Sequence, residues 1–308
     1  GGNIGMPVLS LPKNKTGYVL ELSSFQLDLI SFFNPTISVL LNITPDHLDR
    51  HGTFDEYCKA KMRALRGDGI KIIGIDTEAS REIYDTFSQN GEKNIIAISA
   101  NRKKNTISLS DSILHDDFYD ANSYKIPELQ NLAGKHNKEN ITAAYAVCRS
   151  LGLKPNIIID QLTSFQGLKH RMQNLGSKNN VTYYNDSKAT NASSASGSLA
   201  SMQNIFWLAG GIFKEESLGP LEKSLSNVKK AYLFGESSLL FSKYLKNKVD
   251  FEVFNTMQEA FSKANIDAKR SKEHAYIVLA PACSSFDQFK NFEERGNKFI
   301  DLCNEELQ

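Results

Sequence analysis

The chain has 308 residues, of which 41% are hydrophobic and 23% are charged, and this composition is ordinary for a globular protein long enough for two domains. Its 36 Lys and Arg residues balance 35 Asp and Glu residues, and the formal net charge of +1 excludes an electrostatic case for binding nucleic acid or an anionic membrane. The four cysteines lie far apart without a C-x-x-C pair, so a zinc site or a disulfide framework is not predicted and a reducing cytoplasm is favoured. No apolar run approaches the roughly 20 residues that cross a bilayer.

The first half of the chain predicts strands and helices in alternation. Residues 17–22 are mostly apolar and predict a buried strand that carries one carboxylate, Glu21. Residues 24–33 have the spacing of a short amphipathic helix, which Pro35 ends, and residues 36–43 predict the next strand. Further strands are expected at residues 71–75 and 94–98, and further helices at residues 137–151 and 155–162.

A polar connector that contains Gly167 predicts a domain boundary, with a first domain of residues 1–167 and a second of residues 168–308. Beyond it, strand and helix signals alternate regularly. The expected strands are residues 181–184, 205–208, 230–234, 250–254 and 275–279, and the expected helices are residues 217–225, 237–245 and 257–270. Such alternation predicts an α/β fold with a parallel, doubly wound sheet.

Residues 41–61 concentrate titratable groups between a strand end and a helix. Thr53 and Glu56 have the spacing of a capping box, so the helix that carries Lys61 is expected to begin there. His47 lies in the preceding loop, at the carboxyl end of a predicted strand. Open α/β sheets place their ligands at this edge.

Glu21 and His47 fall at the ends of neighbouring predicted strands, with Lys61 and the carboxylates of Asp46 and Asp49 nearby. Together these groups could hold a Mg²⁺ ion, which takes one or two protein carboxylates and completes its octahedron with water and phosphate oxygens. The alternative remains open that Glu21 pairs with a lysine and that His47 is an ordinary loop residue.

Three further groups of polar and small residues follow strands of the second domain. They are residues 185–191 with Asp186 and Lys188, residues 209–211 with Lys214, and residues 279–289 with Cys283 and Ser284. Their glycines, amides and charges suit a carboxylate or a phosphate, although each could be an ordinary turn or helix cap. Cys283 would need a neighbouring base to act as a nucleophile, and the sequence indicates none. A single cleft between the two domains would explain all of these groups jointly.

Several motifs are long enough to compare with known families. They are Gly2-Asn-Ile-Gly5, Glu21-Leu-Ser-Ser-Phe-Gln26, Asn42-Ile-Thr-Pro-Asp-His-Leu-Asp-Arg50, His136-Asn137 with Asn140, Gly167-Leu-Lys-His-Arg171, Asn185-Asp-Ser-Lys-Ala-Thr-Asn191, and Pro281 to Gly296. Over nearly the whole chain they resemble the Mur ligases of peptidoglycan synthesis, in particular the members that add D-glutamate. The resemblance implies a central ATP-binding domain of the P-loop type, followed by a Rossmann-like domain that binds the incoming amino acid.

The resemblance also implies a cytoplasmic, monomeric, ATP-dependent enzyme that uses Mg²⁺ and joins D-glutamate to UDP-N-acetylmuramoyl-L-alanine through an acyl phosphate and a tetrahedral intermediate. By matching motif, Glu21, His47 and Lys61 would be the catalytic metal ligands. Lys61 would be carbamylated, because a carbamate is an anionic ligand whereas a lysine cation repels Mg²⁺. ATP would be bound by Asn137, Asn140, Arg171, Asp186 and Lys188. The muramoyl substrate and D-glutamate would be bound by Asn3, Ser23, Gln26, Thr190, Lys214, Ser285, Phe286 and Phe292.

One feature of the family does not occur in the chain. There is no G-x-x-G-K-[ST] phosphate-binding loop and no uracil-binding N-terminal domain. We expect both to precede Gly1, so that the chain is a fragment, and we expect these 308 residues alone to be inactive because the triphosphate lacks its cradle.

Other functions fit parts of the same pattern. A superfamily ligase with another amino-acid substrate, such as a folylpolyglutamate synthetase, would share the fold, although the C-terminal motifs favour D-glutamate. A non-catalytic nucleotide-binding or partner-binding relative would tolerate substitution of Glu21, His47 and Lys61. A metallohydrolase would require His51 to point into the same site as His47, and the zinc signature H-E-x-x-H on a helix is absent here.

Overall fold

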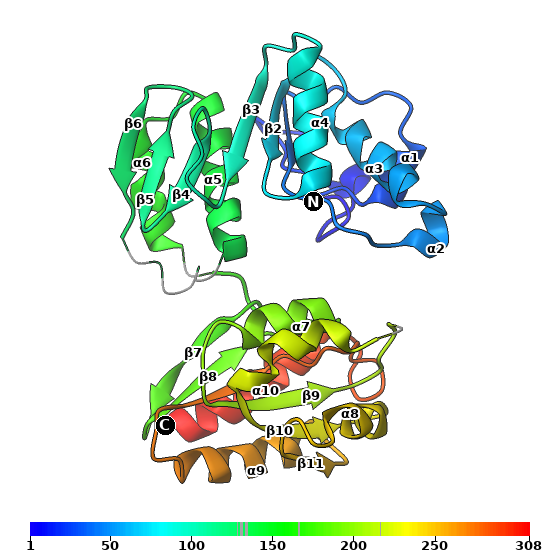
Figure 1. Cartoon of the computed structure of the whole chain (residues 1–308), viewed down its shortest axis with the longest axis vertical. Helices are drawn as coiled ribbons and strands as arrows, with labels where there is room; N and C mark the ends of the chain where they lie inside the picture. Colours follow the sequence, from blue (N-terminus) through cyan, green and yellow to red (C-terminus); the bar gives the residue numbers. More distant parts are fainter. Residues whose placement is uncertain (128, 130–131, 133–134, 166, 216) are drawn as a thin grey trace. The chain divides into compact units, whose positions relative to one another are not determined.

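The computed structural model describes residues 1–127, 129, 132, 135–165, 167–215 and 217–308, with only the backbone described at residues 135 and 136. The chain divides into two compact units, unit 1 with residues 1–165 and unit 2 with residues 166–308 (Figure 1). Each unit has its own parallel-rich sheet, so the prediction of a two-part α/β fold is confirmed. Among the described residues, no helix is both long and apolar enough to span a membrane.

The described residues of unit 1 form a six-stranded sheet whose spatial order follows the chain from β1 to β6. Neighbouring strands are parallel from β1 to β4, and β5 and β6 add antiparallel hairpins at one edge. The strands are β1 (Ile37–Leu40), β2 (Ile70–Gly74), β3 (Ile95–Ser99), β4 (Ile107–Ser110), β5 (Ile113–Asp116) and β6 (Asn122–Lys125). The helices are η1 (Val8–Ser10), α1 (Ser24–Leu29), α2 (Leu48–His51), α3 (Phe54–Met62), η2 (Arg63–Leu65), α4 (Glu78–Gln89), α5 (Lys135–Ser150) and α6 (Pro155–Ser164).

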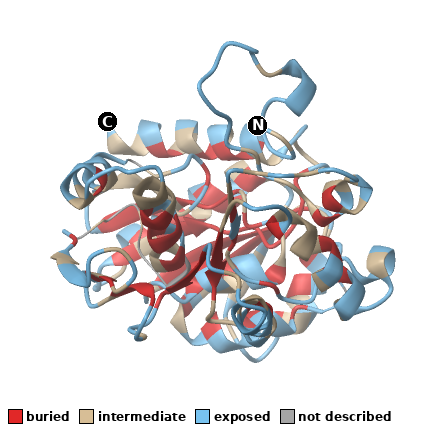
Figure 2. Ribbon diagram, turned by 90° about the horizontal axis from the view of Figure 1, so that it is seen from above, coloured by how far each residue is buried: buried red, intermediate tan, exposed pale blue. Residues whose placement is uncertain are grey.

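Helices cover both faces of this sheet. Successive strand residues point to opposite sides, so neighbouring residues of one strand pack against different helices. Ile73 packs in one cluster with Tyr57 of α3 and Ile83 of α4. Its neighbour Ile72 packs on the other face, in a cluster with Tyr145 of α5. Buried residues therefore concentrate in the strands and on the inner helix faces (Figure 2).

The prediction of a buried strand at residues 17–22 is wrong. These residues form only an isolated bridge, between Gly2 and Glu21. Val19 is 89% exposed and Tyr18 is 47% exposed. An apolar run becomes a buried strand only where neighbouring strands supply hydrogen bonds on its edges and helices cover its faces. Among the described residues this segment has neither.

Unit 2 also has a six-stranded sheet in its described residues, in the order β11-β10-β9-β12-β8-β7, with β7 antiparallel to β8 and the other pairs parallel. The strands are β7 (Gln173–Lys178), β8 (Val181–Asn185), β9 (Ile205–Gly210), β10 (Val228–Phe234), β11 (Phe251–Phe254) and β12 (Ala275–Leu279). The helices are α7 (Ala192–Leu199), η4 (Gly219–Asn227), α8 (Ser238–Leu245), α9 (Met257–Lys269) and α10 (Phe292–Leu307).

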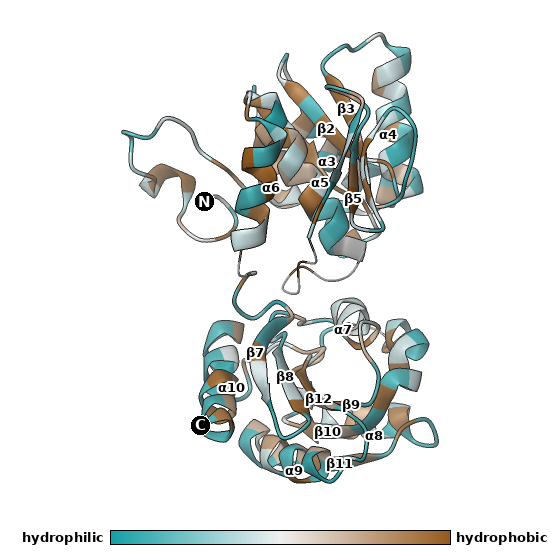
Figure 3. Cartoon of the chain, turned by 90° about the vertical axis from the view of Figure 1, so that its left-hand side faces the viewer, coloured by the Kyte–Doolittle hydropathy of each residue, from teal (hydrophilic) through white to brown (hydrophobic). Residues whose placement is uncertain are grey.

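Connection order assigns the helices of unit 2 to the two faces of its sheet. The chain moves in one direction from β8 through β9 and β10 to β11, and right-handed crossovers then place α7, η4 and α8 on one face. It returns from β11 to β12, which places α9 on the opposite face. The buried clusters agree, because Trp207 packs with the first set of helices and Phe299 of α10 packs with α9. The strands are accordingly rich in apolar residues (Figure 3).

The parallel strands expected in unit 2 are present, and two details differ from the prediction. Strand β7 was not predicted, because only one of its six residues is a large apolar residue and it lies at a sheet edge. The helix expected at residues 217–225 is the 3-10 helix η4.

Candidate functional site

The loop after β1 holds His47 in a constrained backbone conformation. Its φ is 53°, in the left-handed region that non-glycine residues seldom adopt. The His47 amide donates to Asp46 Oδ1 at 2.8 Å, and His47 Nε2 lies 3.6 Å from Asp46 Oδ2. The His47 side chain is 48% exposed, so the loop fixes the backbone and leaves the imidazole accessible.

Aromatic contacts bring His47 and Lys61 to one cluster of side chains. The Phe25 ring of α1 lies 5.1 Å from the His47 ring and 5.6 Å from the His51 ring. The His51 ring lies 5.4 Å from the Tyr57 ring, and Lys61 Nζ lies 5.9 Å from the centroid of Tyr57. Helices α1 and α3 therefore meet where the sequence predicts metal ligands.

His51 lies in this cluster, but its imidazole is engaged. His51 Nε2 lies 3.0 Å from Ser24 Oγ, within hydrogen-bond distance. Among the described residues, no group of three or more His, Cys, Asp or Glu side chains is arranged to hold a metal.

Glu21 is held by the backbone of the first residues of the chain. Its amide donates to the Gly1 carbonyl at 3.0 Å, and its carbonyl accepts from the Asn3 amide at 2.8 Å. Gly2, with a φ of 104°, makes this approach possible, because a Cβ there would lie 2.3 Å from the Glu21 carbonyl oxygen. The structure thus brings Asn3 beside Glu21. Among the described residues, the exposed Glu21 carboxylate makes no hydrogen bond or ion pair with His47 or Lys61.

Ser23 and Gln26, expected to bind substrate, form a capping box at the start of α1. The Gln26 amide donates to Ser23 Oγ at 3.3 Å, and the Ser23 amide donates to Gln26 Oε1 at 3.0 Å. The box fixes the helix that follows Glu21 and carries Phe25. A role in substrate binding would be additional to this local role.

The predicted nucleotide-binding residues of unit 1 lie on the first turns of α5. Asn140 Nδ2 donates to Asn137 Oδ1 at 3.3 Å. The intervening Glu139 is 8% exposed and accepts from Asn42 Nδ2 at 2.9 Å. This hydrogen bond joins α5 to the end of β1, where the His47 loop begins.

In unit 2, the loop after β8 positions Asp186 and Lys188. Asp186 is 8% exposed, and its carboxylate accepts hydrogen bonds from the Met172 amide at 3.2 Å and from the Ser198 hydroxyl. Lys188 Nζ lies 4.1 Å from the centroid of the Phe292 ring. Lys188 and Phe292, which the sequence assigns to different ligands, therefore lie in contact.

The loops after β9 and β12 also meet. Lys214 Nζ lies 5.2 Å from the centroid of the Phe286 ring, which is 63% exposed. Ser285 is 2% exposed, and its carbonyl accepts from the Phe289 amide at 2.9 Å. The two remaining predicted residues, Arg171 and Thr190, are exposed.

Residues 4–148 match the family model of the Mur ligase middle domain. The chain is 46% identical over 308 residues to the "UDP-N-acetylmuramoylalanine--D-glutamate ligase" of Rickettsia bellii, a match that spans 98% of this chain and 68% of that protein. The chain belongs to the Mur ligase family. Equally named proteins of Rhizobium meliloti and Wolbachia pipientis are 42% and 36% identical to it, and each match spans 97% of this chain.

Solved structures of Mur ligases share the fold. MurC of Thermotoga maritima matches with a TM-score of 0.65 at 14% identity, over 93% of this chain and 64% of that one. MurF of Acinetobacter baumannii matches with a TM-score of 0.64 at 17% identity, over 92% of this chain and 64% of that one. The chain therefore spans about two thirds of the length of the Mur ligases that it matches.

The sequence did not predict two buried residues near the candidate site of this Mur ligase chain. Arg295, 0% exposed, and His170, 4% exposed, lie at the same sheet edge as the predicted ligand-binding loops. His170 Nδ1 lies 3.0 Å from Asn185 Nδ2, and burial lowers the pKa of His170 below its usual value. Both residues stand inside the family motifs, but the sequence gives no sign that their side chains turn inward.

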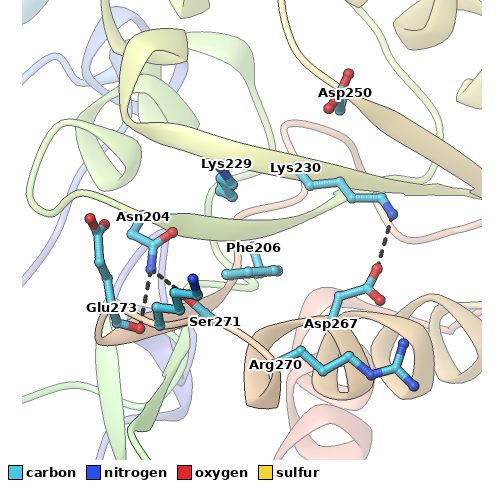
Figure 4. Close-up of a pocket in the computed structure, with 10 residues that line it drawn as sticks. Asn204, Phe206, Lys229, Lys230, Asp250, Asp267, Arg270, Ser271 and Glu273 are labelled. Carbon is cyan, nitrogen blue, oxygen red and sulfur yellow. Dashed lines mark hydrogen bonds and ion pairs between the residues drawn. The ribbon is translucent and has the colours of Figure 1, made fainter.

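A separate hollow of about 510 Å³ lies at the opposite, amino edge of the unit 2 sheet (Figure 4). Its charges are partly satisfied within the wall, since Lys230 Nζ lies 2.9 Å from Asp267 Oδ2. None of the side chains predicted to bind ligands in this Mur ligase chain lines it. The wall consists of Asn204, Phe206, Lys229, Lys230, Asp250, Asp267, Arg270, Ser271, Lys272 and Glu273.

Proposed function

We propose that the gene product containing this chain is an ATP-dependent ligase that joins D-glutamate to UDP-N-acetylmuramoyl-L-alanine in peptidoglycan precursor synthesis. The observation that carries the proposal is the 46% identity, over 98% of the chain, to a protein named for this ligation. The motifs that hold the predicted site residues lie inside the matched region.

The proposed reaction proceeds in two steps, phosphorylation of a carboxylate and formation of an amide. The carboxylate of the muramoyl-alanine substrate attacks the γ-phosphorus of ATP, which forms an acyl phosphate and releases ADP. The neutral amine of D-glutamate then attacks the acyl carbon, the tetrahedral intermediate expels inorganic phosphate, and the amine nitrogen loses a proton. The protein contributes mainly orientation and charge neutralisation.

Side chains of both units supply these contributions in the proposal. Lys214, with the exposed Phe286 ring beside it, would bind a carboxylate of D-glutamate, and Lys188 would bind an ATP phosphate oxygen. The further proposed contacts are Asn137, Asn140, Arg171 and Asp186 to ATP, Asn3, Ser23 and Gln26 to the muramoyl substrate, and Thr190, Ser285 and Phe292 to D-glutamate.

The donor set of unit 1 suits Mg²⁺. The ion takes few protein ligands and keeps several waters, and the accessible His47 imidazole and exposed Glu21 carboxylate match this requirement better than a closed cage would. When bound, Mg²⁺ would offset the negative charge of the phosphate oxygens. Glu21 would hold one ion, and His47 and Lys61 a second.

Lys61 is suited to carbamylation. In the described part of the chain, no carboxylate lies within ion-pair distance of Lys61 Nζ, which lies 5.9 Å from the centroid of the Tyr57 ring. The neutral amine adds to carbon dioxide, the nitrogen loses a proton, and the product is an anionic carbamate whose oxygens can bind Mg²⁺.

The test substitutes the proposed metal ligands one at a time in the complete gene product. We expect Glu21→Gln, His47→Ala and Lys61→Ala each to lower the rate of D-glutamate-dependent phosphate release by at least about 100-fold, because each removes charge stabilisation at the phosphates. Lys59→Ala is the matched control, since Lys59 lies on the same helix and its Nζ pairs with Glu56 at 2.7 Å. Full activity of the Lys61→Ala enzyme would contradict the role of Lys61 as a metal ligand, and absence of D-glutamate-dependent phosphate release from the parent would support the non-catalytic alternative.

A further inference from the structure

Arg295 lies fully buried in the second turn of α10, at the carboxyl edge of the unit 2 sheet. Its guanidinium makes four hydrogen bonds. Nε donates to Ser187 Oγ at 3.0 Å, and Nη2 donates to the carbonyls of Ser187 at 2.9 Å and Cys283 at 3.0 Å. Nη1 donates to the Gly210 carbonyl at 3.4 Å.

These three acceptor residues belong to three different segments of the chain. Ser187 follows β8, Gly210 ends β9, and Cys283 follows β12. A planar guanidinium presents its donors in a fixed fork, so one side chain sets the spacing of the three strand ends. The loops that continue from them carry the proposed ligand contacts at Thr190, Lys214 and Ser285.

The surrounding backbone is closely fitted to this side chain. A Cβ on Gly211, whose φ is 127°, would lie 3.2 Å from Arg295 Nη1 and 2.1 Å from the Ser284 carbonyl oxygen. Ser187 Oγ also donates to the Phe292 carbonyl at 2.8 Å, which ties the first turn of α10 to the same point. Movement of one loop would therefore disturb the others.

The charge of Arg295 is not cancelled by a contacting acid. In the part of the chain that the structure describes, no carboxylate lies within ion-pair distance of the guanidinium, and Asp287 acts on it only from farther away. Burial lowers the pKa of Arg295 to about 10, so it stays protonated at neutral pH. An apolar residue would avoid the desolvation cost of a buried charge, but it would take this donor from the carbonyls of Ser187, Gly210 and Cys283. The arginine therefore acts on the three loops through its hydrogen bonds.

We propose that Arg295 is a positioning residue of the ligase site. It holds the three strand-end loops in register and supplies a fixed positive charge at this edge, which favours an incoming amino acid with an additional carboxylate over a neutral one. The inference rests on the proposed function for the identity of that amino acid, whereas the clamping of the loops is a property of the fold.

The first test compares Arg295→Met and Arg295→Lys with Phe299→Leu in the complete gene product. Phe299 lies one turn further along α10, is fully buried, and packs against Phe261 of α9 in the core, so its variant controls for loss of stability. We expect Arg295→Met to raise the KM for D-glutamate by about tenfold or more, because displacement of the loop that carries Lys214 would weaken a charged hydrogen bond to the amino acid. Arg295→Lys, which keeps the charge and loses the fork, should give a smaller rise. A KM within twofold of the parent in a folded Arg295 variant, or an equal rise in Phe299→Leu, overturns the specificity role.

The second test follows amide hydrogen exchange and needs no activity. We expect Arg295→Met, or Arg295→Lys if the first does not fold, to speed exchange at residues 186–190, 210–214 and 281–287 together, while residues 205–208 of β9 stay protected. Unchanged exchange in the three loops, or equally fast exchange throughout unit 2, contradicts the clamp. If the parent enzyme shows no D-glutamate-dependent turnover, the proposed function fails, and this measurement still decides the role of Arg295.

Discussion

Asp76 illustrates how single residues secure the sheet edge of unit 1. Its carboxylate accepts hydrogen bonds from Ser99 Oγ at 2.6 Å, the Ala100 amide at 2.7 Å and Lys103 Nζ at 2.8 Å. Burial opposes ionisation of Asp76, but these three bonds outweigh it and lower its pKa to about 2. The ionised carboxylate therefore joins the ends of β2 and β3 to the loop that follows.

This carboxylate makes stability depend on pH. Because the pKa in the folded chain is below that in the unfolded chain, about 3.9, the stabilisation is complete above pH 4 and is lost as the pH falls toward 2. We expect Asp76→Asn to reduce the free energy of unfolding at pH 7 by about 1–2 kcal/mol, and the difference to shrink near pH 2. Urea unfolding at both pH values measures it. Asp160→Asn, at an exposed site on α6, should show no such dependence, and an equal loss at pH 7 and pH 2 would rule out the linkage.

Side-chain burial distinguishes candidate catalytic residues that the sequence alone could not tell apart from structural ones. Cys283 stood next to a serine and near a helix start, but burial raises its pKa to about 12, so the thiolate needed for nucleophilic attack is scarcely populated at neutral pH. Lys214 and Phe286 were expected from motifs alone, and their contact joins residues that lie 72 positions apart in the sequence. No local pattern encodes such a distance, so residue types were predictable and their grouping was not.

At the scale of elements, Gly74 shows how closely β2 approaches its neighbours. A Cβ at Gly74 would lie 1.9 Å from the Leu41 carbonyl oxygen and 2.7 Å from Glu139 Oε1. The glycine therefore permits the end of β1 and the first turns of α5 to meet, where Asn42 donates to Glu139.

We expect Gly74→Ala to destabilise unit 1 by about 2–4 kcal/mol, because backbone atoms must shift to remove the overlap. Thermal unfolding measures the loss as a lower Tm. Gly17→Ala is the control, since nothing lies within 4 Å of a Cβ there. If both variants unfold at the same temperature as the parent, the packing described for β1, β2 and α5 is incorrect.

Elements were predictable where local pattern and tertiary environment agree. Residues 205–208 and 275–279 are apolar runs that become central parallel strands β9 and β12, buried by helices on both faces. Residues 17–22 have a similar pattern and no such surroundings among the described residues, so the same inference failed. Strand β7 shows the reverse case, because pairing with β8 at an edge stabilises a segment with little apolar character.

At the scale of the whole molecule, each unit has its own hydrophobic core. Two buried clusters contain only residues of unit 1, and the other two contain only residues of unit 2. Each unit therefore has buried apolar residues of its own that can support cooperative folding.

We expect residues 166–308, expressed alone, to fold cooperatively, because this segment keeps both faces of its sheet covered. Circular dichroism during thermal unfolding should show one sigmoidal transition. As a control, Trp207→Ala in the same segment removes a fully buried ring and should lower the midpoint markedly. Gradual, non-cooperative loss of signal in the parent segment would contradict the independence of unit 2.

The proposed function is tested most directly by the amino acid that the complete gene product joins to its substrate. The decisive measurement supplies ATP, Mg²⁺ and UDP-N-acetylmuramoyl-L-alanine with D-glutamate, L-glutamate or D-alanine in parallel, and follows phosphate release and the mass of the product. We predict one phosphate released for each amide formed, with D-glutamate strongly preferred over both alternatives. No amide product with D-glutamate, or equal turnover with D-alanine, would contradict the proposed ligation and its preference for an acidic amino acid.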